Sequence, residues 1–270
     1  MVCMQDILHL IHSLMPMRDA ARAACVSRSF LHPWICHPNL NFSKYTLGLN
    51  ENACQKDESA RFFYIKVDHI LKKHSGIGVK KLKIQINSDY SANKGLVFST
   101  GDELGFPLSH SLALEQLELR NCDRIVFLKV PRLLQRLNYL EVRGCAKLKV
   151  IHNEAPNVSS FVFGGDSTVQ LSVGETLQMK SLTMDRYGSV SYARAELPSS
   201  MPNLEALTIY TFKRAYAPML CSKLLFLRHL SIALIGAPVY PTYDYLSLAS
   251  FFYAAPSLET FNLNVSCHSY

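Results

Sequence analysis

The chain has 270 residues, of which 49% are hydrophobic and 18% are charged, and its formal net charge is +7. This apolar share provides for a continuous core and excludes a disordered chain. The excess of 28 Lys and Arg over 21 Asp and Glu is mild, and the basic residues are scattered rather than gathered in a stripe, so we expect no nucleic-acid partner.

The first forty residues have a helical period. Their leading apolar residues are spaced i, i+1, i+4 and i+7: Ile7, Leu8, Ile11 and Leu14. This stripe predicts a short helix that ends at Met15-Pro16. The Ala-rich stretch from Arg18 to Cys25 predicts a second helix, and Ser27 to about Ile35 a third. Three short helices make a small core, so this segment should pack on the rest of the chain or on a partner.

From residue 79 onward one motif recurs. The template apolar-x-x-apolar-x-apolar fits eight times, with central residues Leu82, Leu117, Leu140, Phe161, Leu182, Leu207, Leu230 and Phe261. Five consecutive steps, of 23, 21, 21, 25 and 23 residues, match the period of leucine-rich repeats. Each unit supplies one short strand whose alternate side chains point inward, and only stacked units bury that face. We therefore expect an irregular α/β solenoid with a parallel β-sheet on its concave face.

The segments between these strands carry nine prolines, so we expect few long helices in them. The best helical candidate is residues 246–254, which end before Pro256. Gly164-Gly165-Asp166 follows a strand without a clear helix after it, so it predicts a turn rather than a phosphate-binding loop. Cys122 and Cys145 occupy the Asn/Cys position that follows a repeat strand, which favours structural thiols over reactive ones.

The N-terminal helices carry a recognisable string. It runs Asp6-Ile-Leu-x-x-Ile11-x-Ser-Leu14-Met-Pro16-x-Arg-Asp19-Ala-Ala-Arg22-x-x-x-Val26-Ser27-Arg28-x-Phe30 and resembles an F-box. With Trp34-x-Cys-His37-Pro-Asn-Leu40 and the later strings 194–205 and 247–252, the chain resembles plant F-box proteins with leucine-rich repeats. The resemblance implies an F-box at 1–40, a linking strand and helix at 41–78, and the solenoid at 79–270.

In that family the F-box docks onto the Skp-type adaptor of a cullin-RING ubiquitin ligase, and the repeats hold the substrate. The resemblance therefore implies a substrate-recognition subunit whose partners are the adaptor, through it a cullin, and a protein substrate. The adaptor-facing residues carried over from the family are Ile7, Leu8, Ile11, Leu14, Pro16, Asp19, Val26 and Ser27.

The outward strand positions form the candidate substrate surface. One column reads Lys83, Glu118, Glu141, Val162, Thr183, Thr208, Ser231 and Asn262, and the next reads Gln85, Arg120, Arg143, Gly164, Asp185, Tyr210, Ala233 and Asn264. The predicted substrate-binding residues are Glu118, Arg120, Glu141, Arg143, Asp185 and Tyr210. Such a patch suits a partner carrying both charge signs. Alternatively, the charged residues satisfy one another across the ladder.

No sequence feature predicts catalysis or a cofactor. The eight cysteines include no Cys-x-x-Cys pair, so we expect neither a metal site nor a dithiol redox site. Metalloprotease, nucleophile-elbow, dinucleotide and Walker A motifs are absent, so we expect no catalytic residues and no enzyme activity. With no signal peptide and no apolar stretch of about 18 residues, the expectation is an intracellular protein of the nucleus or cytoplasm, without a membrane partner.

Two other functions stay open. One is a protein-interaction module that has lost ligase assembly, because the family's opening Leu-Pro-x-Asp is here Cys3-Met4-Gln5-Asp6, and because Pro33 should kink or shorten the third helix. The other is a receptor that senses a small molecule in a repeat pocket. That receptor would need convergent Arg or Lys side chains beyond Arg120 and Arg143.

Overall fold

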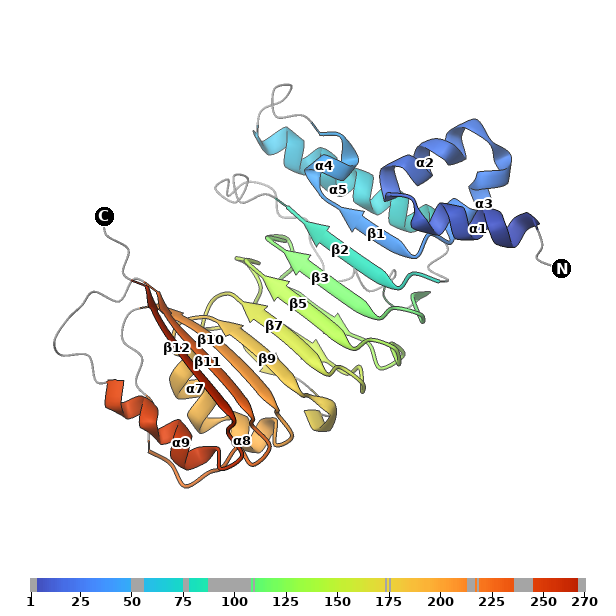
Figure 1. Ribbon diagram of the computed structural model, residues 1–270. Helices are drawn as coiled ribbons and strands as arrows, with labels where there is room; N and C mark the ends of the chain where they lie inside the picture. The colour runs from blue at the N-terminus through green and yellow to red at the C-terminus, as the bar shows by residue number, and fades with distance from the viewer. Residues whose placement is uncertain are drawn as a thin grey trace.

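The structure, a computed structural model, describes residues 4–49, 56–74, 78–86, 108, 110–172, 174, 176–212, 217, 219–235 and 245–266. Its main feature is a parallel sheet of nine strands in the order β1-β2-β3-β5-β7-β9-β10-β11-β12 (Figure 1). These strands span β1 Asn39–Phe42, β2 Lys81–Gln85, β3 Gln116–Arg120, β5 Tyr139–Arg143, β7 Ser160–Gly164, β9 Ser181–Asp185, β10 Ala206–Phe212, β11 His229–Ile235 and β12 Thr260–Ser266. The predicted parallel sheet is confirmed.

The inward residues of the repeat form one continuous ladder. The register pairs them in the predicted order: Leu82, Leu117, Leu140, Phe161, Leu182, Leu207, Leu230 and Phe261. All are at most 1% exposed except Phe261, which lies on the edge strand β12 and is partly exposed. Leu40 of β1 extends the ladder at the other end by pairing with Leu82. The template missed β1 because this strand carries only the alternation Leu40-x-Phe42.

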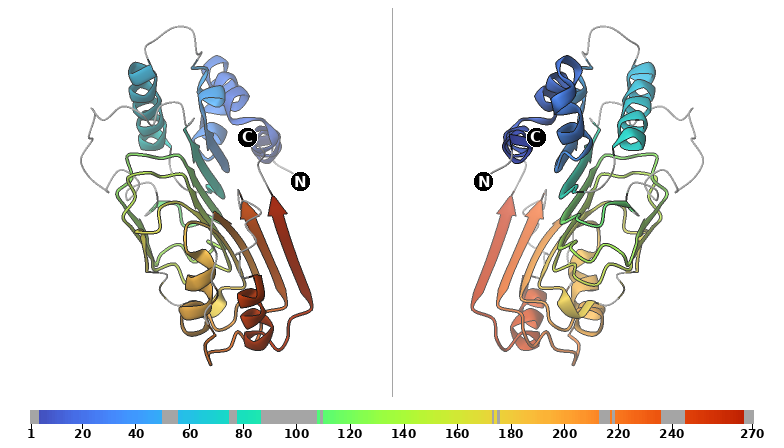
Figure 2. Two further views of the ribbon diagram at one scale, coloured as in Figure 1. Left: turned by 90° about the vertical axis from the view of Figure 1, so that its left-hand side faces the viewer. Right: turned by 90° about the vertical axis from the view of Figure 1, so that its right-hand side faces the viewer.

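The segments that connect the strands cover one face of the sheet (Figure 2). They contain α5 Lys56–Lys73, α7 Ser189–Ala195, α8 Leu197–Ser200, α9 Ser250–Ala254, the 3-10 turns η3 Thr176–Gln178 and η4 Tyr245–Ala249, and a second parallel sheet of β4 Phe127–Val130, β6 Val150–Asn153 and β8 Gln170–Ser172. The helix expected at 246–254 is confirmed as η4 and α9. The second sheet, α7 and α8 were not predicted. The other face of the main sheet, over which none of the connecting segments described above lies, is the open face.

Two expectations about the repeat turns are confirmed. Gly164-Gly165-Asp166 is a turn in which Oδ1 of Asp166 accepts the backbone N–H of Thr168 at 2.8 Å. Cys122 is buried, and its Sγ lies 3.6 Å from the carbonyl oxygen of Ile84. Cys145 is also buried, and its Sγ lies 3.6 Å from the carbonyl oxygen of Arg143. Both thiols therefore pack under the turns as structural groups.

Three α-helices precede β1: α1 Met4–Leu14, α2 Met17–Val26 and α3 Leu31–Ile35. The segment predicted as one third helix is instead the 3-10 turn η1 Arg28–Phe30, capped by the Ser27 hydroxyl, followed by the short α3. Pro33 lies in the first turn of α3, where a missing N–H costs no intrahelical hydrogen bond. Of the two effects expected, a kink or a shorter helix, the structure has the shorter helix. Helix α2 contacts β1 and α4 Lys44–Leu47. Cys3 lies outside the described residues.

Three buried histidines join these helices to the solenoid. His12 of α1 donates from Nε2 to a backbone carbonyl of α2 at 3.0 Å. His37 accepts the first N–H of β1 at Nδ1 and therefore donates from Nε2 to the carbonyl of the residue after α1, both at 3.2 Å. The rings of His12 and His37 lie 5.6 Å apart, and His74, just after α5, packs edge-on against Trp34. The joint is thus made of imidazoles that must stay neutral.

Acid should weaken this joint. Burial lowers the pKa of His12, of His37 and of His74, the last to about 4. Because these values lie below the 6.5 of an unfolded histidine, the unfolded chain binds more protons in acid. The stabilisation is therefore complete above pH 6.5 and is lost as the pH falls towards 4. For His74 alone the loss at about pH 5 is about 2 kcal/mol, or roughly 5 °C in melting temperature.

The test compares melting temperatures at about pH 7.5 and pH 5 for the native chain, His74→Leu and His229→Gln. His229 is exposed on the open face and serves as the control. The native chain and His229→Gln should show the same fall, and His74→Leu a smaller one. Equal falls in all three proteins would show that His74 does not carry the dependence.

The ladder makes a second prediction. Leu140 is fully buried in the middle of the stack, so Leu140→Ala should lower the free energy of unfolding by roughly 2–5 kcal/mol through the cavity that it leaves. Thr183→Ala, a truncation on the open face, should cost at most about 0.5 kcal/mol. Urea denaturation followed by circular dichroism measures both. Similar losses for the two variants would contradict a continuous ladder.

Candidate functional site

The N-terminal helices expose a set of apolar side chains, here named the helical apolar surface. Its members and their exposed fractions are Ile7 43%, Leu10 61%, Ile11 48%, Leu14 77%, Val26 85% and Leu31 48%. Met17 and Ala20 point inward instead and are buried. A helix whose apolar stripe faces solvent is typical of a surface that a partner covers.

Most residues predicted to face an adaptor belong to this surface or border it. Ile7, Ile11, Leu14 and Val26 are in it, and Pro16 and Asp19 are exposed beside it. Leu8 is half-buried, where it lines a small cavity together with His32 and Pro33. Ser27 is also partly buried, because its hydroxyl caps η1.

The sequence reasoning missed Leu10 and Leu31. Leu10 lies three residues after Ile7 and four before Leu14, so helical spacing could have placed it on the same stripe. Leu31 begins α3 and shares no sequence period with α1, so only the packing of the two helices could reveal it.

The open face carries the two predicted columns in register. Strand pairing aligns Lys83, Glu118, Glu141, Val162, Thr183, Thr208, Ser231 and Asn262, and it aligns Gln85, Arg120, Arg143, Gly164, Asp185, Tyr210, Ala233 and Asn264. The structure therefore brings four of the predicted substrate-binding residues together on β3 and β5. Asp185 and Tyr210 lie side by side on β9 and β10, separated from Arg143 by Gly164.

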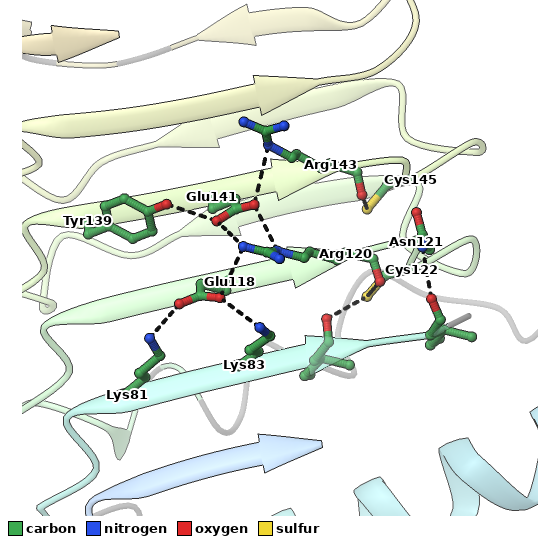
Figure 3. A network of polar contacts seen from close by, with 12 residues as sticks. Lys81, Lys83, Glu118, Arg120, Asn121, Cys122, Tyr139, Glu141, Arg143 and Cys145 are labelled. Atoms are coloured by element: carbon green, nitrogen blue, oxygen red, sulfur yellow. Dashed lines mark hydrogen bonds and ion pairs between the residues drawn. The ribbon is translucent and has the colours of Figure 1, made fainter. Parts of the chain in front are cut away.

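Glu118 is the first centre of an ion-pair network on β2, β3 and β5 (Figure 3). Its carboxylate lies 2.6 Å from Nζ of Lys81 and 3.4 Å from Nζ of Lys83. Nη2 of Arg120 lies 3.6 Å away, on the side towards β5. Glu118 is only 5% exposed, so three cations enclose one buried carboxylate.

Glu141 is the second centre. Arg120 binds it through two nitrogens, with Nε 2.8 Å from Oε1 and Nη2 2.9 Å from Oε2. Nε of Arg143 lies 3.3 Å from Oε1, and the hydroxyl of Tyr139 donates to Oε2 at 2.8 Å. Glu141 is only 2% exposed. Lys81, Lys83, Glu118, Arg120, Tyr139, Glu141 and Arg143 together are named the charge cluster.

The network shifts the pKa of three of its groups, Glu118, Arg120 and Tyr139. Burial alone would raise the pKa of Glu118, but the hydrogen bond and charge of Lys81, with the charges of Lys83 and Arg120, outweigh burial and lower it. The hydrogen bond to Glu141 raises the pKa of Arg120. Burial, then the hydrogen bond to Glu141, raises the pKa of Tyr139 to about 12. Glu118 and Arg120 are therefore held in their charged forms, and Tyr139 in its neutral form.

The two carboxylates and the cations differ in access. The carboxylate oxygens of Glu118 and Glu141 form ion pairs and hydrogen bonds beneath the surface. This arrangement is the one expected if the charged residues satisfy one another. The side chains of Lys81, Arg120 and Arg143 remain between 37% and 40% exposed. Only the cations therefore offer free surface to a molecule that approaches the open face.

A metal-binding group and a membrane-spanning helix are both absent from the described residues. Among them, no group of three or more His, Cys, Asp and Glu side chains is arranged to hold a metal ion. Within the same part of the chain, no helix has both the length and the apolar character needed to cross a membrane.

Comparison with known proteins addresses the repeat region. A family model described as "At1g61320/AtMIF1, LRR domain" matches residues 95–270, more than half of the chain. The matched segment contains strands β3 to β12, and with them both centres of the charge cluster. A search of curated proteins found no match. The eight repeats, the single parallel ladder and this match agree, and the chain belongs to the At1g61320/AtMIF1 leucine-rich-repeat domain family.

Proposed function

We propose that this chain is the substrate-recognition subunit of a Skp-cullin-F-box type ubiquitin ligase. The helical apolar surface binds the Skp-type adaptor, and the leucine-rich repeats bind the target protein. The observation that carries the proposal is the exposed stripe of α1, because it lies within the segment whose sequence resembles an F-box. A leucine-rich-repeat domain is a protein-interaction module, which supports the second half of the proposal.

The exposed stripe is large enough to support a specific complex. Fully burying one Leu or Ile side chain contributes about 1.5–3 kcal/mol. A micromolar complex corresponds to about 8 kcal/mol of binding free energy. Leu10, Leu14 and Val26 are each more than 60% exposed, so a partner that covers them removes most of their surface from water. The apolar contact thus supplies a substantial share of the required free energy, less the cost of association.

In the proposed ligase, this chain positions the target protein relative to the other subunits. In this proposal it has no catalytic residues and no cofactor, and other subunits transfer ubiquitin. The adaptor, and through it the cullin, is held at the N-terminal end while the repeats hold the target. Two separate surfaces on one chain raise the local concentration of the target near the transfer machinery.

The adaptor contact is tested by charge insertion. Ile11→Asp with Leu14→Asp places two carboxylates in the proposed interface, where an unpaired buried charge costs several kcal/mol. We expect calorimetric titration with a Skp-type adaptor to show at least about 100-fold weaker binding than for the native chain. Leu14 is 77% exposed, so the folded chain itself tolerates the change better than at half-buried Leu8.

Leu177→Asp with Leu225→Asp is the matched control. These leucines are 64% and 55% exposed, in the segments that precede β9 and β11, far from α1 in sequence. The control variant should bind the adaptor as the native chain does, and circular dichroism should show all three proteins folded. If the α1 variant binds normally, the docking surface is wrong. If the native chain does not bind any Skp-type adaptor, the interaction module without ligase assembly becomes the better account.

A further inference from the structure

We infer that the open face over β2, β3 and β5 binds an extended acidic segment of a partner protein. This inference deepens the proposed function by naming the class of target, but the binding itself does not require adaptor docking. It rests on the charge cluster, in which both carboxylates are buried and the cations are not.

The charge cluster carries more positive than negative charge. Lys81, Lys83, Arg120 and Arg143 stand against Glu118 and Glu141, which leaves the cluster net positive by two. The negative charges lie beneath the surface and the positive charges lie over them. A partner therefore meets guanidinium and ammonium groups, and a carboxylate is the complementary group that Arg binds best.

The spacing of the cations across the strands suits an extended peptide. Neighbouring strands lie about 4.8 Å apart, so Lys83 on β2 and Arg143 on β5 are separated by roughly 10 Å across the sheet. An extended chain advances about 3.3 Å per residue, so about three residues cover that distance. Two acidic residues with one or two residues between them lie about 7–10 Å apart, and the long Lys and Arg side chains bring both ends of the cluster within their reach. The ligand that fits is a short acidic run that crosses the strands.

Among the described strands from β2 to β12 of the main sheet, the Lys and Arg side chains of the open face are confined to the charge cluster on β2, β3 and β5. Among the described outward side chains of β7, β9, β10, β11 and β12, Asp185 is the one Asp, Glu, Lys or Arg. Serine, threonine and asparagine fill most of the other positions. The acidic run is thus held on β2, β3 and β5, and Asp185 repels its extension along the face. Neutral residues of the target on either side of the acidic run would suit the rest of the open face.

A nucleic acid fits these features less well. The cations are already half neutralised by the glutamates, whereas affinity for a phosphate backbone grows with the number of uncompensated charges. Single-stranded nucleic acid also stacks its bases on aromatic side chains. Tyr139 is the aromatic residue of the cluster, and its hydroxyl is tied to Glu141. A peptide with alternating carboxylates is the better match.

The test uses the full chain and a fluorescein-labelled peptide of eight alternating Glu and Ser residues. Fluorescence anisotropy at about 50 mM NaCl should detect binding, which should weaken steeply by about 200 mM because the contact is ionic. Lys83→Gln with Arg143→Gln should weaken binding at least about tenfold. Each buried glutamate keeps partners in this variant, because Glu118 retains Lys81 and Arg120, and Glu141 retains Arg120 and Tyr139. The variant is therefore expected to fold.

Lys147→Gln with Lys149→Gln is the matched control. Both lysines are exposed in the turn that leads to β6, on the covered side of the sheet, and the control loses the same net charge. It should bind the acidic peptide as the native chain does. Equal weakening in the two double variants would show a general charge effect and overturn the site, as would a failure of the native chain to bind at low salt.

Two further arms separate this inference from other accounts. A Lys-Ser peptide of the same length should not bind. An octauridine that binds more tightly than the acidic peptide, and loses affinity in the Lys83/Arg143 variant, would assign the face to nucleic acid and refute the inference. Adaptor titration of the same variant should be unchanged. The two proposals fail separately. A native chain that binds the adaptor but not the acidic peptide refutes this inference alone, and one that binds the peptide but no Skp-type adaptor refutes the proposed function alone.

Discussion

The structure depends on one constraint, the in-register parallel stacking of short strands whose alternate side chains are buried. A single unit cannot remove its apolar face from water, so each strand relies on its neighbours. Parallel pairing sets residues of equal repeat position side by side along the whole sheet. Both the interior ladder and the outward columns follow from this register.

The same register creates a conflict that the charge cluster resolves. Glu118 pairs directly with Glu141, and Arg120 pairs directly with Arg143, so like charges stand opposite each other on adjacent strands. Like charges in that position are destabilising. Arg120 removes the conflict, because its guanidinium reaches both carboxylates, at 3.6 Å from Glu118 and at 2.8 Å from Glu141. The two outer lysines and Arg143 complete the pairing, and both carboxylates become buried anions held between cations.

Much of this architecture was predictable from the sequence, because equivalent positions of successive repeats pair with one another in a parallel sheet. The eight templates placed the eight inward residues and both outward columns correctly. The elements that were missed depend on contacts rather than on a period. A linking strand was expected within 41–78, but the template could not place β1, which begins at Asn39 and carries only two inward residues. Strands β4, β6 and β8 pair only because stacked repeats bring their segments together. The burial of Glu118 and Glu141 also depends on cations from neighbouring strands, which a single strand's pattern does not contain.

The two surfaces lie near one end of the molecule. Figure 2 shows α1 and α5 on opposite sides of the sheet, with α1 on the side of the open face. Only β1 separates β2, where the charge cluster begins, from the N-terminal edge of the sheet. In the proposed function, a target held on the cluster would thus lie close to the adaptor. The buried histidines set how firmly that end is fixed to the solenoid.

Amide hydrogen exchange of the full chain, alone and with excess Skp-type adaptor, tests the central claim most directly. The account predicts that strands β3, β5, β7, β9, β10 and β11 exchange slowest in both conditions. It also predicts that the adaptor slows exchange within residues 4–35 and leaves the open face unchanged. Protection that appears on the sheet, without any change in residues 4–35, would contradict the assignment of two separate surfaces to this chain.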